Sequence, residues 1–178
     1  MTWTAPKTFI ANDTLSSAEL NVHLRDNLLE AAPAKARNVG AYFVSNGDNT
    51  LSERIPTGDL ESTAEQSAST SYVDLATIGP SVTATTQSQA FVIISCHMYN
   101  SGANAVWMSY DVSGTTVTAA ADNRALMFNN AAGQGQRAGV VILHATLIPG
   151  PNTFTAKYRV STAGTGTWSD RRIAILPF

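Results

Sequence analysis

Residues 152–160 read NTFTAKYRV, and this stretch decides the fold class. Apolar side chains stand at every second position from Phe154 to Val160, with Thr155, Lys157 and Arg159 between them. Successive side chains of a β-strand point to opposite faces of the sheet, so a period of two predicts a strand. This strand should bury one face and leave the other face in water.

The chain from Ser71 onward continues in the same manner. Turn signals such as Gly79-Pro80, Ser113-Gly114 and Gly164 to Gly166 separate short apolar segments. Strands of this length and spacing predict an antiparallel β-sandwich or barrel, which we place at residues 63–178. The expected strands are 71–78, 80–86, 89–99, 104–112, 115–120, 124–129, 137–148, 152–161 and 167–177.

Two segments, 90–96 and 138–143, are almost wholly apolar. A strand that is apolar on both sides needs cover on both faces, but the outer face of a single sandwich should be wet. These segments therefore favour burial against a second subunit. The residues assigned to the subunit interface are Phe91, Ile93, Val141 and Leu143.

Residues 1–62 have a higher density of charged residues than the rest of the chain, and we predict that they form a separate N-terminal segment. Ser16 and Glu19 match a capping box, in which each side chain bonds the other residue's backbone N–H. Leucines then recur at every fourth position until Pro33, which predicts one amphipathic helix over residues 16–32 after an extended arm. Residues 41–55 are predicted to form a hairpin, and the polar residues 56–59 and 62–70 are predicted to form a linker.

A single helix of this length is marginal in water, so its leucine stripe must pack on something. The stripe packs on the chain's own sandwich, on another copy of the chain or on another protein. The flanking segments hold few apolar residues, and we therefore expect the segment to anchor the chain to a partner. The residues assigned to this anchor are Trp3, Phe9, Leu20, Leu24 and Leu28.

Composition excludes several functional classes. Only 13% of the 178 residues are charged, and 11 scattered bases stand against 13 acids, so there is no basic face for nucleic acid. No run approaches the roughly 20 apolar residues of a membrane span. The start of the chain lacks an apolar stretch of signal-peptide type, which predicts synthesis and retention in a cytoplasm. The single cysteine, Cys96, excludes a disulfide framework.

No pattern in the sequence predicts catalysis, a cofactor or a metal. The three histidines His23, His97 and His144 lack ligand spacing, and no G-x-S-x-G elbow is present. A glycan hydrolase would need two carboxylates flanking a cleft. The carboxylates of the β-region all lie near expected turns or strand ends: Glu65, Asp74, Asp111, Asp122 and Asp170.

Two further groups of residues leave alternatives open. Arg171 and Arg172 either pair on the surface with Asp170 or Asp111, or bridge two subunits. Four aromatic residues either pack in the core or line a shelf for sugar rings. They are Tyr99, Trp107, Tyr110 and Trp168.

Several motifs, taken in order, resemble virion proteins of tailed phages, especially phages of actinobacteria. They are TWTAPKTF at 2–9, LNVHLRDNLLE at 20–30, TSYVDL at 70–75, NTFTAKYRV at 152–160 and DRRI at 170–173. The resemblance spans nearly the whole chain. It implies a jelly-roll-like β-sandwich, trimeric assembly and a place on the surface of the particle, and it implies no catalytic residues.

The expectation is therefore a non-enzymatic virion surface protein, a trimeric capsid decoration or head-fibre protein made in the host cytoplasm. The alternative is a minor tail or tail-fibre protein that binds a host receptor glycan. Expected partners are further copies of the chain, a major capsid or tail protein, and in the alternative a host cell-surface glycan. Nucleic acid, membranes and cofactors are not expected partners.

Overall fold

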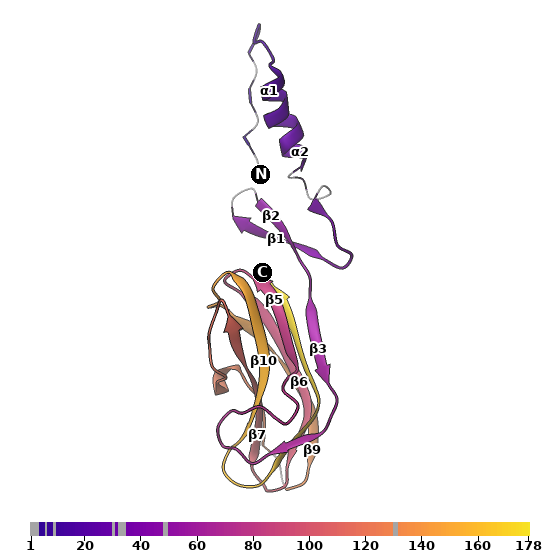
Figure 1. Cartoon of the computed structure of the whole chain (residues 1–178), viewed down its shortest axis with the longest axis vertical. Coiled ribbons are helices and arrows are strands. Elements are labelled where there is room, and N and C mark those ends of the chain that lie inside the picture. Colours follow the sequence, from indigo (N-terminus) through magenta and orange to yellow (C-terminus); the bar gives the residue numbers. More distant parts are fainter. Residues whose placement is uncertain are drawn as a thin grey trace. The chain divides into compact units, whose positions relative to one another are not determined.

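The computed structural model describes residues 4–5, 7–8, 10–29, 31, 35–47, 50–129 and 132–178. The chain divides into two compact units, Met1–Ile55 and Pro56–Phe178 (Figure 1). The sequence placed the division after Ser62 instead. The difference arises because Thr57–Glu61 is a strand that pairs with the last strand of the sandwich.

The second unit is a sandwich of two antiparallel sheets (Figure 1). One sheet has the order β5-β10-β7-β8, and the other has the order β3-β11-β6-β9, with β4 pairing beside β3 along β11. The strands are β3 (Thr57–Glu61), β4 (Glu65–Ser67), β5 (Ser81–Thr86), β6 (Ala90–Asn100), β7 (Ala105–Gly114), β8 (Leu126–Asn129), β9 (Gly135–His144), β10 (Gly150–Val160) and β11 (Gly166–Pro177).

These two strand orders are those of a jelly roll. When β3 and β4 are counted together as the first strand, the sandwich has eight strands within the described residues. Their order in the two sheets is that of two Greek keys. The expected jelly-roll-like antiparallel sandwich is thus confirmed.

Strand β10 follows the alternation predicted for it. Phe154, Ala156, Tyr158 and Val160 are completely buried, while the side chains between them are partly exposed on the outer face. Apolar residues of β6 and β7, among them Ile94 and Met108, meet them from the two sheets to form one core. Burial of this contiguous core is the main favourable term in the stability of the sandwich.

Three segments differ from the expected strand pattern. The polar stretch 62–70 is not simply a linker, because Glu65–Ser67 pairs with β11. Segment 71–78 contributes only an isolated bridge, from Val73 to Tyr158, and segment 115–120 only a bridge from Thr118 to Val112. Each segment thus pairs at a single position with a strand of the sheet β5-β10-β7-β8, and neither carries the apolar alternation of a buried strand.

In the first unit, a helix begins where the capping box predicted. Glu19 donates its backbone N–H to Ser16 Oγ at 3.2 Å, and Ser16 donates its own to Glu19 Oε2 at 2.9 Å. The helix comprises α1 (Ser17–Leu20), a π-helical turn (Asn21–Asp26) and α2 (Asn27–Leu29). Its expected end at Ala32 lies outside the described residues.

The arm runs beside this helix and is held by two polar contacts. Asn27 exchanges two hydrogen bonds with the backbone of Thr4, each of 2.9 Å, and Lys7 pairs with Glu19. The bond from Lys7 is the largest cause that lowers the pKa of Glu19, to about 2. A hairpin of β1 (Tyr42–Gly47) and β2 (Thr50–Arg54) follows, as predicted for residues 41–55.

Candidate functional site

The outer face of the sheet β3-β11-β6-β9 carries a cluster of apolar side chains that the rest of the sandwich leaves exposed or only half-buried, although the ring of Phe178 packs edge-on against Phe91. Strand register places Phe91 between Leu143 and Leu176, and Ile93 between Val141 and Ala174. The four residues predicted for a subunit interface therefore lie side by side on two neighbouring strands. We name this cluster the apolar sheet face: Leu60, Phe91, Ile93, Val141, Leu143, Ala174 and Leu176.

The apolar side chains of this face have large exposed fractions. Val141 is 60% exposed, Leu143 49% and Phe91 37%, although their neighbours Val92 and Ile94 are completely buried. Within the sandwich, the apolar segments at 90–96 and 138–143 thus turn one face toward the core and leave the other face exposed. Contiguous exposed apolar residues mark interaction sites more often than isolated ones do.

Strand β9 is incompletely covered on its inner side as well. Ala138, Val140 and Ile142 point toward the core but are only partly buried. The cause is that β8, which follows β7 at the edge of the other sheet, is only four residues long. In the described part of the chain β9 pairs with β6 alone, so its other edge offers unpaired backbone groups.

The charged residues near the apolar sheet face are few. Arg137 pairs with Asp170 at one end of the sheet. Arg172 stands beside Leu60 and lines an open hollow of about 390 Å³, and its side chain makes no ion pair or hydrogen bond with the described residues. The predicted surface pairing of Arg171 with Asp170 or Asp111 is wrong. Arg171 is completely buried and lies 3.2 Å from Glu65.

The opposite sheet presents a polar outer face. Hydroxyl groups pair across its strands, Ser81 with Thr155 at 2.9 Å and Thr83 with Thr153 at 2.8 Å. Farther along the sheet, Lys157 bridges Asp74 and Asp111, and Arg159 bonds Asp122. Polar side chains on this face thus pair with one another, in contrast to the apolar sheet face.

The aromatic residues considered for a sugar shelf do not come together on the surface. Tyr110 and Trp168 are completely buried, which agrees with the core-packing alternative. The guanidinium of Arg159 covers the ring of Trp107 at 3.9 Å from the ring centre. Tyr99 lies on the other sheet next to His97. The four rings therefore form no common shelf on which a sugar ring could stack.

The remaining candidates for chemistry are dispersed. Among the described residues, no three His, Cys, Asp or Glu side chains are grouped as metal ligands would be. No helix in the described ranges has the length and apolar character needed to cross a membrane. His144 is buried, and its Nδ1 lies 3.1 Å from the hydroxyl of Tyr110, whose ring also faces Arg124.

This buried histidine should make stability depend on pH. Burial, together with the positive charge of Arg124, lowers the pKa of His144 below its ordinary value of 6.5. The unfolded chain therefore binds a proton that the folded chain does not, and the free energy of unfolding should fall as pH drops below about 6.5. One proton contributes a slope of at most about 1.4 kcal/mol per pH unit.

Urea unfolding between pH 5 and 7 checks this slope. His144→Asn should flatten it, whereas His97→Asn, at a partly exposed position, should leave it unchanged. Equal slopes in the wild type and His144→Asn would show that His144 does not cause the pH dependence.

The helix of the first unit exposes the predicted stripe. Leu20, Leu24 and Leu28 are 39%, 57% and 68% exposed. The pattern missed two further exposed apolar residues on the helix, Val22 and Leu29, and Leu15 just before the N-cap is exposed as well. Trp3 and Phe9, the other predicted anchor residues, lie outside the described residues. Asn27 is the one buried residue of this unit within the described ranges, so the helix has no core of its own there.

Comparisons with known proteins leave the function open. No family model and no curated protein matches the sequence. Structures similar to this chain include Eiger TNF from S. frugiperda, with 8% identity and a TM-score of 0.48 over 70% of this chain and 92% of that chain. Another is infectious bursal disease virus, Gx strain, with 15% identity and a TM-score of 0.43 over 74% of this chain and 35% of that chain. At these values neither carries an argument about what this chain does.

Proposed function

We propose that the protein is a non-enzymatic component of a phage virion, a homotrimer that decorates the capsid or forms a head fibre. The first unit anchors it to a capsid protein, and the sandwiches associate with one another. The observation that carries this proposal is that each unit leaves an apolar surface uncovered. Burial of these surfaces is favourable and requires a partner for each.

The apolar sheet face supports association of the sandwich with its own copies. It combines exposed Phe, Val and Leu side chains with few charges, which is the composition typical of the buried centre of a protein interface. Strand β9 extends this surface around the edge of the sheet, because its inner side chains and its free edge also lack cover. The trimeric state itself follows from the resemblance to phage virion proteins.

The leucine stripe of the helix supports attachment of the first unit to another protein. A helix that is apolar on more than one side is stable only when it is surrounded. The described residues of this unit provide the helix only with the arm, through Asn27 and Glu19. We therefore place the helix in an apolar groove of the virion partner. The particle surface is the proposed location of the assembled protein.

The alternative function is a minor tail or tail-fibre protein that binds a host glycan. The hydroxyl-rich outer face around Thr83 and Thr153 favours it, since glycans are recognised largely through hydrogen bonds. In that case the purified trimer should bind host cell-wall sugar, which a decoration protein does not require.

Truncation separates the two roles assigned to the units. A chain that lacks residues 1–35 should remain folded, and light scattering should give the mass of a trimer of this shortened chain. It should no longer co-sediment with heads of a phage from which the gene for this protein has been deleted, whereas the full chain does. Co-sedimentation with isolated tails instead would favour the alternative. A full-length monomer at micromolar concentration would contradict the proposal.

A further inference from the structure

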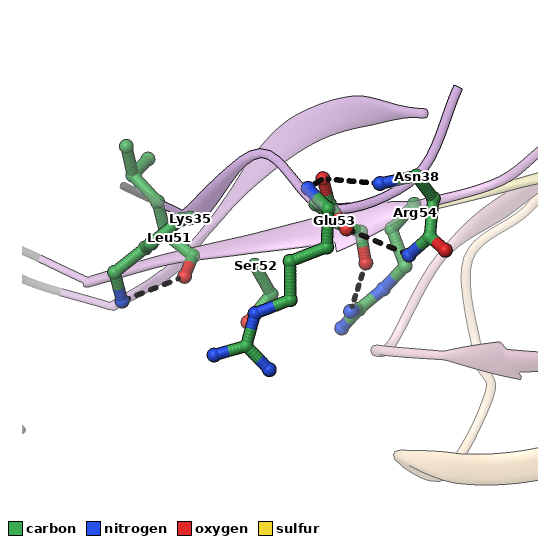
Figure 2. A pocket seen from close by; sticks show the side chains of 7 residues that line it. Lys35, Asn38, Leu51, Ser52, Glu53 and Arg54 are labelled. Atoms are coloured by element: carbon green, nitrogen blue, oxygen red, sulfur yellow. Dashed lines mark hydrogen bonds between the residues drawn. The ribbon is translucent and has the colours of Figure 1, made fainter. Parts of the chain in front are cut away.

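The hairpin unit contains an open hollow of about 430 Å³ between β2 and the segment that precedes β1 (Figure 2). Its lining is mostly polar and carries three basic side chains but one acidic side chain. The lining residues are Lys35, Arg37, Asn38, Leu51, Ser52, Glu53 and Arg54.

The single acid of this hollow is already engaged by backbone and amide donors. Glu53 Oε1 accepts the backbone N–H groups of Arg37 and Asn38, and Oε2 accepts the Asn38 side-chain amide at 2.8 Å (Figure 2). The Arg37 N–H is the largest cause that lowers the pKa of Glu53, so this carboxylate is ionised at neutral pH. Its role is to fix the backbone turn at residues 37–38 against β2.

Among the described residues, no carboxylate lies at ion-pair distance from the two guanidinium groups of this hollow. Arg54 donates to two neutral acceptors, the backbone oxygen of Glu53 at 2.9 Å and Asn46 Oδ1 at 3.3 Å. The Arg37 side chain makes no hydrogen bond or ion pair with the described residues. By contrast, four bases of the sandwich each lie in an ion pair: Arg137, Lys157, Arg159 and Arg171.

We propose that this hollow receives a carboxylate from an acidic segment of the protein to which the first unit docks. A guanidinium pairs with a carboxylate through charge-assisted hydrogen bonds, which are stronger than bonds between neutral groups. A hollow of this size, open to solvent and lined by polar groups, admits a side chain of a partner. The exposed leucine stripe supplies apolar contact area, and the charge pair fixes the orientation of the docked partner.

This inference deepens the proposed anchoring role and rests on it. A fluorescein-labelled hexaglutamate peptide is the probe, and anisotropy with the full-length chain is the measurement. The peptide should bind more tightly than hexaglutamine, and its affinity should fall as salt rises. Arg37→Gln should weaken it about tenfold, which is of the order expected for a charge-assisted pair.

Arg25→Gln is the matched control, because Arg25 lies in the same unit but pairs with Asp26 at 2.8 Å. It removes the same charge and should leave the affinity for the peptide nearly unchanged. The Arg37 side chain makes no bond that holds the fold, so Arg37→Gln should retain the circular dichroism of the wild type. Arg37→Lys, which keeps the charge, should restore part of the affinity.

In the binding assay, three results would overturn the inference: equal binding of hexaglutamate and hexaglutamine, equal losses of affinity in Arg37→Gln and Arg25→Gln, or displacement of the peptide by inorganic phosphate far more efficiently than by chloride at equal ionic strength. The last would identify a phosphate site. Unchanged co-sedimentation of Arg37→Gln with phage heads would overturn this inference alone. Failure of the wild type to co-sediment would instead contradict the proposed function.

Discussion

Replacing Glu65 by glutamine should lower the free energy of unfolding by about 3–5 kcal/mol, the range measured when one partner of a buried ion pair is removed. The Arg171 side chain is completely buried, and its Nη2 lies 3.2 Å from Glu65 Oε2. Glu61 is the other nearby acid, at 3.9 Å. The Thr77 backbone N–H and hydroxyl donate to the Glu65 carboxylate at distances of 2.7–3.1 Å. Glutamine keeps an acceptor oxygen for them, so the substitution mainly removes the charge.

Substitution of the other partner, Arg171, should lower the free energy of unfolding by less. Arg171 Nε and Nη2 have no hydrogen-bond acceptor, so its contact with Glu65 is electrostatic rather than directional. Arg171→Met removes a poorly satisfied buried cation and leaves Glu65 with its bonds to Thr77. We therefore expect the loss in Arg171→Met to be clearly smaller than the loss in Glu65→Gln, and the double variant to recover most of the stability.

Urea unfolding at pH 7 and one fixed protein concentration measures all three variants. The concentration matters because association with other copies adds to apparent stability. Glu61→Gln is the matched control, since its greater distance from Arg171 predicts a smaller effect. If Glu65→Gln and Glu61→Gln lower the free energy of unfolding equally, the ion pair with Glu65 is not what compensates the buried charge of Arg171.

The burial of Arg171 could not be predicted from the sequence. Strand β11 contains a bulge between Ser169 and Arg172, with Asp170 at a φ of +49°. The extra residue shifts the alternation, so that Arg171, Ile173 and Ile175 point inward in place of Asp170 and Arg172. Residues 173–176 are apolar at every position and so hide this shift in the sequence, and two adjacent arginines were therefore both expected on the surface.

Features set by local chemistry were predictable. The capping box at Ser16, the alternation of β10 and the hairpin at residues 41–55 each depend on side chains within a few residues of one another. The apolar sheet face was also predictable, because apolar residues at consecutive positions of β6 and β9 must fill both faces of a strand. Its register was not, since the pairing of Ile93 with Val141 depends on the whole sheet.

The hollow of the hairpin unit could not have been found in this way. Arg37 and Arg54 are far apart in the sequence, and they meet because Glu53 bonds the backbone at residues 37–38. The boundary of the two units has a similar cause. Thr57–Glu61 carries no alternating apolar pattern, and it becomes a strand because it pairs with β11.

Val141→Asp should convert the proposed trimer into monomers. Val141 is 60% exposed in the single chain, so the substitution places a carboxylate in water when the chain is alone and costs the fold little. In the trimer it would bury that carboxylate among Ile93, Leu143 and their counterparts without a partner. The penalty for an unpaired buried charge is several kcal/mol, which weakens each contact by more than about a hundredfold.

Val117→Asp provides a matched control because it makes the same chemical change at a position that is 84% exposed and outside the apolar sheet face. Light scattering at micromolar concentration should give the trimer mass for the wild type and Val117→Asp, and the mass of one 18.8-kDa chain for Val141→Asp. Unchanged urea unfolding of the monomeric variant at low concentration would show that only association is lost. If Val141→Asp remains trimeric, the copies meet through another surface, and the uncovered side chains of β6 and β9 must be buried by a different partner.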